Sequence, residues 1–356
     1  MIIRRNAILL LLLPFLVAAC GKKAGQEEHF DLTTVRNGVL LRDAPTLDGK
    51  SLLELKENTP LRDLGQVSDN LTHLEYQGAA FDEPWIRVGG PDSLEAWVYG
   101  ADVMPIGADS SAVRRFRQDK SLQALLGAGL LDSLQQFNRT YEQIPDAAGL
   151  AAAYREGDSL RLAISNALGA KLVTFPVPDI TFMRERIRGY QPLLVAEGTA
   201  WYLFNDYTQW LTAARKTPEP EDDAFIEVMI ACFPEDSIEY FYPVWFLQTW
   251  DYGGKSLLGQ GHHFEILEKA DALFAKNNLF HPELNDLKKR ILDDITDVNV
   301  SYWEDAPTIR QELDKILTRK WAILSEADLG VIRIRRAQFD DPEKNGIQYN
   351  ARSGEE

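Results

Sequence analysis

The hydrophobic pattern of the chain changes at about Ser110, and this change limits the folds that its 356 residues can adopt. Over residues 35–106, short runs of aliphatic and aromatic residues alternate with turn formers, which is typical of a small antiparallel barrel or sandwich. After Ser110, apolar residues recur every three or four positions, as on one face of a helix. We therefore predict a multidomain α+β fold. A small all-β domain over 32–107 precedes a larger, mostly α-helical domain over 110–338.

Two prolines help to place the predicted helices. About eight or nine helices fit between Ser110 and Leu324. Pro282 and Pro307 stand where a first helical turn accepts proline, because the missing N–H has no partner there in any case.

The end of the chain departs from the helical pattern. Residues 331–336 are rich in β-branched side chains, which predicts a short strand that returns to the β domain. Residues 339–356 are polar and predict a flexible tail.

The first twenty residues have the pattern of an export signal. Arg4 and Arg5 precede an apolar run over 7–19 that is too short to span a bilayer and predicts a signal peptide over 1–19. Residues 17–20 (Val-Ala-Ala-Cys) resemble the bacterial lipobox. In that family the cysteine becomes the first residue after cleavage and carries fatty acyl chains such as palmitate.

The lipobox resemblance implies a place for the protein. It implies lipidation at Cys20, a lipidated tether over 20–31 and a lipid anchor in the bacterial cell envelope, on its periplasmic or surface face. Gly21 stands where aspartate would retain a lipoprotein of enteric bacteria in the inner membrane, so the resemblance favours the outer membrane.

Charge and cysteine content exclude several classes of protein. The 54 acidic residues outnumber the 38 basic ones, and loss of Arg4 and Arg5 would change the net charge from −16 to −18. Such a chain does not fit a general nucleic-acid binder, which needs cations to displace phosphate counterions. Its attraction to anionic peptidoglycan or lipid is weak at long range, which favours a protein or cation partner. Two cysteines exclude a disulfide-rich scaffold, and acylation of Cys20 would leave Cys232 unpaired.

The β region also resembles the bacterial SH3-like domains of cell-envelope proteins. Residues 41–45 (Leu-Arg-Asp-Ala-Pro) are similar to the opening segment of that family, and residues 55–61 to its strand, tight turn and strand. Residues 85–88 (Trp-Ile-Arg-Val) match its tryptophan-led strand, and residues 96–99 (Ala-Trp-Val-Tyr) its closing element. The resemblance implies an SH3-like β-barrel over 32–107.

Three features of this region differ from the family pattern. Asn58 replaces a turn glycine, and asparagine is the residue other than glycine that best tolerates a positive φ. Ala96 replaces another glycine, and the connection over 67–84 is longer than usual.

The SH3-like resemblance implies a ligand surface. Members of the family often bind peptidoglycan or its peptides, and sometimes proteins. The residues that would form such a surface are Asp43, Tyr76, Trp85, Trp97 and Tyr99. Aromatic side chains offer a rigid apolar face with a polar edge. The alternative is that Trp85 and Trp97 mainly fill the core of a small domain.

Aromatic residues are concentrated in the middle of the helical region. Fourteen of the 36 in the chain lie between Trp201 and Tyr252. One interpretation is a groove that stacks on sugars or peptides. The other is a helical core, because Trp201, Phe204, Tyr207 and Leu211 have the spacing of one helical face.

Residues capable of catalysis or metal binding occur without a recognisable motif. His262 and His263 are adjacent, but no His-Glu-x-x-His or Cys-x-x-Cys spacing is present, and a polar loop or helix N-terminus explains the pair. Cys232 lies in an apolar segment, which predicts a buried, inert thiol. The acidic groups Glu221, Asp222, Asp223, Glu235 and Asp236 are typical of solvated loops. We predict no catalytic residue, metal or cofactor.

Two functions remain open at this stage. The first is a noncatalytic, lipid-anchored envelope protein that binds peptidoglycan peptides or envelope proteins through its two domains. The second is a cell-wall hydrolase, in which the SH3-like domain targets the wall and the helical domain cleaves it. A transglycosylase needs a positioned glutamate in an aromatic cleft, and Glu197 and Glu239 are the candidates.

Overall fold

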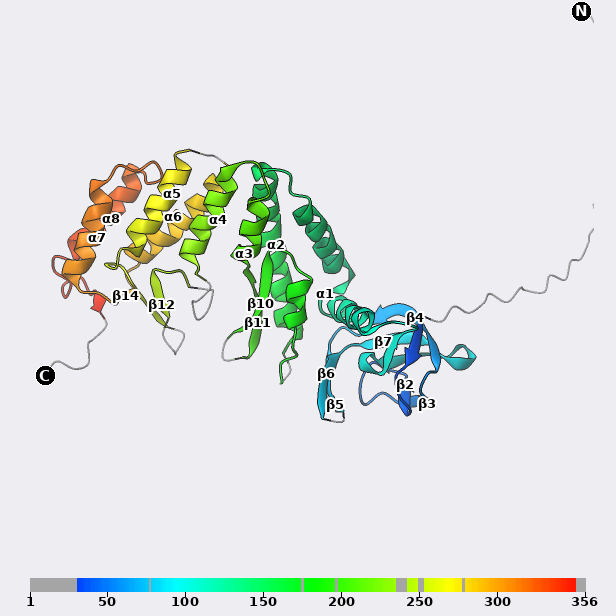
Figure 1. Ribbon diagram of the computed structural model, residues 1–356. Helices are drawn as coiled ribbons and strands as arrows, with labels where there is room; N and C mark the ends of the chain where they lie inside the picture. Colours follow the sequence, from blue (N-terminus) through cyan, green and yellow to red (C-terminus); the bar gives the residue numbers. More distant parts are fainter. Residues whose placement is uncertain are drawn as a thin grey trace, which may run out of the picture.

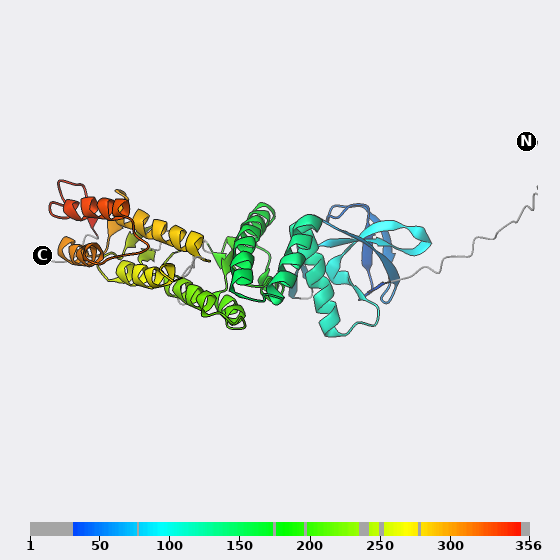
Figure 2. The same cartoon turned by 90° about the horizontal axis from the view of Figure 1, so that it is seen from above.

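The computed structural model places an all-β body at one end of an elongated molecule and the helices in an arch that leads to the other end (Figures 1 and 2). The described residues are 31–76, 78–173, 176–195, 198–234, 242–248, 253–276 and 279–349. The signal peptide and Cys20 lie outside these residues. The prediction of an α+β fold is confirmed.

Nine strands form the β body. Six antiparallel pairings join seven of them in the order β3-β2-β8-β7-β4-β1-β9, and β5 and β6 form a separate hairpin. The strands are β1 Leu32–Thr34, β2 Val39–Arg42, β3 Ser51–Leu55, β4 Pro60–Val67, β5 Thr72–Tyr76, β6 Ala79–Glu83, β7 Trp85–Gly89, β8 Glu95–Tyr99 and β9 Val103–Pro105. Two 3-10 turns, Pro91–Ser93 and Gly100–Asp102, flank β8.

Alternation along the strands gives the β body its own core. Ile86 and Val88 of β7 pack with eight other buried residues, whereas Trp85 points to the opposite face of the sheet. The turn between β3 and β4 contains Asn58 with a φ of 59°, as the sequence predicts for this turn.

The second region combines eight helices with short strands among the described residues. The first half contains α1 Ser110–Glu142, α2 Ala147–Lys171, the 3-10 turn Thr181–Glu185, β10 Tyr190–Val195, β11 Ala200–Asn205, α3 Tyr207–Ala214 and α4 Pro220–Cys232. The second half contains β12 Phe246–Gln248, β13 Gly254–Ser256, α5 His262–Phe274, α6 His281–Thr296, β14 Ser301–Tyr302, α7 Ala306–Thr318, α8 Glu326–Gln338 and β15 Gln348–Tyr349. The strands β10, β11, β12 and β14 lie along the concave side of the arch (Figure 1).

Local signals set several helix ends. The aspartates before α1, α2, α3 and α7 each accept a hydrogen bond from a backbone N–H of the first turn. Pro282 and Pro307 stand in the first turns of α6 and α7, as predicted. Gly127, with φ 69° and ψ 170°, interrupts α1, and the helix changes direction there (Figure 1).

Two local predictions were wrong. Residues 331–336 belong to α8, because the Ser325–Asp328 capping box starts a helix and Leu329, Ile332 and Arg335 become buried at helical spacing. The aromatic stripe from Trp201 to Leu211 divides between β11 and α3. Seven α-helices and one 3-10 helix lie between 110 and 324 among the described residues, where about eight or nine helices were expected.

The residues expected to form a flexible tail are partly structured. Phe339 is buried against Tyr302, and β15 pairs in parallel with β14.

The two regions meet along α1. Lys120 Nζ lies 2.6 Å from Asp63 Oδ2, and Gln123 Nε2 donates to the Gly65 carbonyl. Phe116 packs on the core of the β body, while the rest of the helical region shares one continuous core from α1 to α8. The N-terminal body is therefore attached by a helix that belongs to both packing units.

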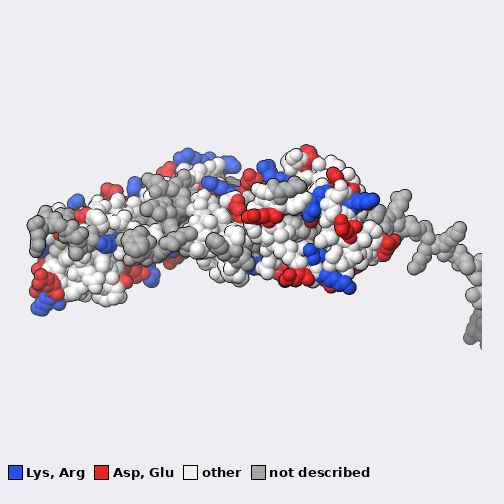
Figure 3. All heavy atoms as spheres, turned by 90° about the horizontal axis from the view of Figure 1, so that it is seen from below, with Lys and Arg blue, Asp and Glu red and all other residues white. Residues whose placement is uncertain are grey.

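Charge is mixed on the face of the molecule in Figure 3, where acidic and basic side chains of the described residues are interspersed. None of the helices within the described residues is both long and apolar enough to cross a bilayer.

Candidate functional site

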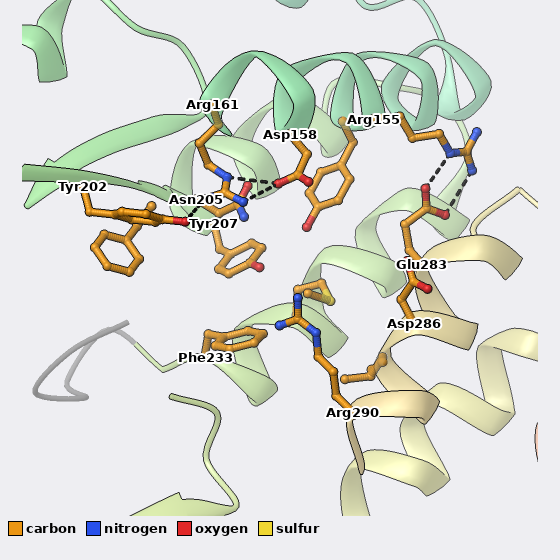
Figure 4. A pocket seen from close by; sticks show the side chains of 14 residues that line it. Arg155, Asp158, Arg161, Tyr202, Asn205, Tyr207, Phe233, Glu283, Asp286 and Arg290 are labelled. Atoms are coloured by element: carbon orange, nitrogen blue, oxygen red, sulfur yellow. Dashed lines mark hydrogen bonds and ion pairs between the residues drawn. The ribbon is translucent and has the colours of Figure 1, made fainter. Parts of the chain in front are cut away.

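A pocket of about 400 Å³ lies in the helical region between α2, β11, α4 and α6 (Figure 4). Its volume is at the lower end of the range of small-molecule sites, roughly 300–1,000 Å³. We call it the α2–α6 pocket. It is lined by three arginines, three carboxylates and five aromatic rings, including that of Tyr154. The pocket therefore combines charged and apolar walls.

The first wall comes from one face of α2. Tyr154, Asp158 and Arg161 are spaced so that they lie on the same side of this helix. Gly157 on the core side lets the rings of Phe137 and Tyr190 approach the helix closely, where a Cβ would clash. Aromatic packing on one side thus fixes the helix that presents charges on the other.

Arg161 is fully engaged with protein groups. Its Nε and Nη2 donate to Asp158 Oδ1 at 3.0 and 2.7 Å, and its Nη1 donates to the Tyr202 hydroxyl and the Leu203 carbonyl. The guanidinium also lies over the Tyr202 ring. Arg161 therefore ties α2 to β11 and holds Asp158 in an ion pair.

A second ion pair ties α2 to α6. Arg155 Nη2 donates to Glu283 Oε2 at 3.0 Å, and the same guanidinium donates to Glu283 Oε1 and to the Leu279 carbonyl. These residues are 128 positions apart in the sequence. The pair closes one side of the pocket (Figure 4).

The α6 wall also presents charges that these pairs do not neutralise. Glu283, Asp286, Leu287 and Arg290 follow one another along the face of α6 that lines the pocket. Among the described residues, neither Asp286 nor Arg290 forms a hydrogen bond or an ion pair with another side chain. Their side chains diverge, and that of Arg290 extends into the pocket toward Tyr207 (Figure 4).

Aromatic rings form the remaining walls. Tyr202 and Phe204 of β11 have ring centroids 5.0 Å apart, and Tyr207 stacks on Phe233 at 6.1 Å. Tyr207 is hydrogen-bonded to Tyr154, and burial raises the pKa of both phenols far above the usual value. Both hydroxyl groups thus stay protonated at neutral pH.

One polar atom of this wall lacks a partner. The Oδ1 of Asn205, the last residue of β11, is buried and accepts no hydrogen bond from any described residue. A buried acceptor without a donor costs about 1–3 kcal/mol, which a ligand that donates to it would recover.

Two of the residues predicted to bind ligand in the β body are buried beneath the β5–β6 hairpin. Trp85 and Tyr99 are 2% and 4% exposed, with ring centroids 5.6 Å apart. Trp85 Nε1 donates to Thr72 Oγ1, and the Tyr99 hydroxyl lies 2.7 Å from the Thr72 carbonyl oxygen. Both side chains hold this hairpin on the sheet.

The other three predicted residues are nearer to solvent but do not gather at one place. Trp97 is half-buried and lines a shallow hollow with Gln123 of α1. Asp43 is exposed and accepts the Lys50 backbone N–H within the β2–β3 turn. Tyr76 is exposed, and the Arg36 guanidinium lies over its ring. A binding role of these five residues stays a prediction.

The histidine pair lies in the first turn of α5, one of the two positions that the sequence suggests. His263 is fully buried, and its Nε2 lies 2.7 Å from Asp294 Oδ2, which also accepts a hydrogen bond from Ser256 Oγ. Glu312 accepts the backbone N–H groups of Gly259, Gly261 and Phe264, and so caps this helix. No group of three or more potential ligands suited to a metal ion occurs among the described residues.

The remaining candidates within the described residues are Cys232 and the acidic residues at the start of α4. Cys232 is buried, and burial raises the pKa of its thiol far above the usual value. Asp222 is buried and accepts a hydrogen bond from Thr217, while Glu221 and Asp223 lie in the first turn of α4. The other four acidic candidates, Glu197, Glu235, Asp236 and Glu239, lie outside the described residues.

The aromatic residues of this region divide between the core and the pocket, and stacking on a ligand stays a prediction. Trp210 and Trp245 are fully buried in the helical core, whereas Tyr202, Phe204, Tyr207 and Phe233 line the α2–α6 pocket. Sequence reasoning missed the charged half of the site. Its only local trace is the helical spacing of Asp158 and Arg161 and of Glu283, Asp286 and Arg290, which equally describes a solvated helix face.

Comparison with known proteins adds no relative: no family model, curated protein or solved structure matches the chain.

Proposed function

We propose that this protein is a noncatalytic, lipid-anchored protein of the bacterial cell envelope that binds peptides of peptidoglycan in the α2–α6 pocket. The observation that carries the binding function is the pairing of charges in this pocket. Asp158 and Glu283, two of its three carboxylates, are each held by an arginine, while Arg290 has no partner among the described residues.

The pairing favours binding over hydrolysis. A general acid or base must reach the reacting group with its carboxyl oxygens, and arginines occupy both oxygens of Glu283 and Oδ1 of Asp158. None of the described lining residues is a serine, cysteine or histidine that could act as a nucleophile or base. Of the described lining carboxylates, only Asp286 is left without an arginine, so the pocket offers no second free carboxylate to complete an acid and base pair.

The proposed barrel and anchor rest on sequence resemblance. We infer that residues 32–107 form an SH3-like barrel, because antiparallel strands coincide with the family's segments and Asn58 has the backbone conformation of the turn glycine it replaces. The lipobox and charged leader support acylation at Cys20 and a place at the outer membrane. Anchoring would confine a weak binding module to a thin layer and raise its effective concentration.

Two measurements test this function. Soluble muropeptides titrated into the full chain should bind with at most millimolar dissociation constants, and no heat change up to several millimolar would refute peptidoglycan binding. In that case the envelope-protein partner would be sought by crosslinking. Labelled palmitate should be incorporated into the wild-type chain and not into Cys20→Ser; equal labelling would refute the anchor.

The hydrolase alternative has its own test. Zymography on purified peptidoglycan should give no clearing zone with the proposed binding protein. A clearing zone that is lost in Glu197→Gln or Glu239→Gln would establish the hydrolase instead.

A further inference from the structure

We propose that the α2–α6 pocket recognises a small zwitterion of dipeptide size, with its carboxylate on Arg290 and its ammonium group on Asp286. This inference rests on the proposed binding function and specifies the ligand of the same site.

Four of the six charged side chains in the pocket are paired with one another. Arg155 is paired with Glu283 and Arg161 with Asp158, and these contacts use guanidinium donors and carboxylate oxygens that a ligand would otherwise meet. Arg290 and Asp286 remain, one of each sign. Both side chains are exposed to solvent, so water solvates whichever charge a ligand leaves unmet. A zwitterion can form two charge-assisted contacts in the pocket, whereas a ligand with a single charge can form only one.

The spacing along α6 gives the distance between the two backbone positions from which these charges extend. Asp286 and Arg290 are four residues apart, which places their backbones about 6 Å apart along the helix axis. Their side chains diverge, and among the described residues they do not form an ion pair with each other (Figure 4). The two ends of an extended dipeptide are about 7 Å apart, since each residue spans about 3.3–3.6 Å. A free amino acid carries its two charges closer together.

The other walls suit the body of such a ligand. Tyr207 and Phe233 stack beside Arg290 and provide an apolar surface for a side chain. Buried Asn205 Oδ1, which accepts no hydrogen bond from a described residue, is an acceptor for an N–H group of the ligand. The volume of about 400 Å³ suits a ligand of this size better than a complete muropeptide.

The experiment uses calorimetric titration of the full chain with alanyl-phenylalanine. The same dipeptide with an acetylated amino group, and with an amidated carboxyl group, tests each charge separately. Phenylalanine alone tests the length of the ligand. We expect the free dipeptide to bind at least about tenfold more tightly than any of the three, because each loses a charge-assisted contact or cannot span both.

Three variants assign the charges to residues. Arg290→Gln should weaken binding of the free dipeptide about tenfold or more and leave binding of the amide unchanged, because the amide has no carboxylate to lose. Asp286→Asn should weaken the free dipeptide and leave the acetylated form unchanged. Lys289→Gln is the matched control, since it removes a positive charge from the same helix at a 72% exposed side chain outside the pocket.

The outcomes separate this inference from the proposed function. Equal affinity for the free and modified dipeptides, or an equal loss in Arg290→Gln and Lys289→Gln, would overturn the zwitterion site. Muropeptide binding without dipeptide binding would overturn it while the proposed function stands. Dipeptide binding without muropeptide binding would support the site and refute peptidoglycan as its source.

Discussion

Asp294 Oδ2 lies 2.7 Å from Nε2 of the fully buried His263 and joins α6 to the first turn of α5. The same oxygen accepts a hydrogen bond from Ser256 Oγ at 2.6 Å. A single carboxylate thus satisfies polar groups of two other elements in the helical core. Its neighbour Asp293 is exposed and contacts only Lys289 among the described residues.

These two adjacent aspartates should differ sharply in their contribution to stability. Asp294→Ala leaves His263 Nε2 and Ser256 Oγ without their acceptor, and we expect it to lower the free energy of unfolding by about 2–4 kcal/mol. Asp293→Ala should change it by no more than about 0.5 kcal/mol, because an exposed ion pair contributes little. Urea unfolding of both variants measures this difference, and similar midpoints would contradict it.

Two glycines of α1 should respond to alanine with opposite signs. Gly127 has φ 69° and ψ 170°, a conformation that is almost exclusive to glycine, so Gly127→Ala should cost about 1–3 kcal/mol. Gly129 is helical with open space where a Cβ would stand, so Gly129→Ala should stabilise the protein by up to about 1 kcal/mol. Thermal unfolding midpoints would show this. A stabilising Gly127→Ala would argue against the bend at Gly127, and a destabilising Gly129→Ala would argue against an open helical position for Gly129.

Glu83 makes stability depend on pH at the contact between β6 and α1. Burial raises its pKa from the usual 4.5 to about 7, although Arg117, with Nε 4.0 Å from Glu83 Oε1, acts in the opposite direction. The folded state therefore binds the proton more tightly than the unfolded state. Stability from this group is fully present below about pH 4.5 and is lost as pH rises through about 7.

The variant Glu83→Gln should remove this pH dependence. Its free energy of unfolding, relative to that of wild type, should rise by up to about 3 kcal/mol between pH 5 and pH 8. Unfolding curves at several pH values would measure this difference. Glu95→Gln replaces a side chain that is 54% exposed, and its free energy of unfolding should change with pH in parallel with that of wild type. A Glu83→Gln curve that is also parallel to wild type would show that this carboxyl group has an ordinary pKa.

The Tyr99 hydroxyl should stabilise the β5–β6 hairpin specifically. It lies 2.7 Å from the Thr72 carbonyl oxygen and 2.9 Å from that of Phe81, one in each strand. Tyr99→Phe should cost about 1–2 kcal/mol and raise amide hydrogen exchange in β5 and β6 more than elsewhere. Tyr76→Phe, at an exposed ring of the same hairpin, is the control. Uniform exchange across the β body in Tyr99→Phe would contradict a local role.

Local sequence signals predicted the parts of the fold that depend on neighbouring residues. The change of hydrophobic period near Ser110 separates the strands from the helices, and Asn58 has the positive φ that its turn requires. The signal failed at 331–336, where β-branched residues favour a strand. A helix forms there because its capping box and the burial of Ile332 against the core outweigh a weak intrinsic preference.

The sequence by itself determined the α+β composition, the order of strands and helices, and the acidic character of the chain. Only the tertiary structure decided which aromatic residues fill the core and which line a pocket. Side chains alternate between the two faces of β11, and a face becomes buried only when a helix covers it. It also decided which charges are paired. Arg155 and Glu283 are 128 residues apart, and no local pattern specifies that they meet while Arg290 stays unpaired among the described residues. Long-range packing sets those distances, and with them the chemistry of the site.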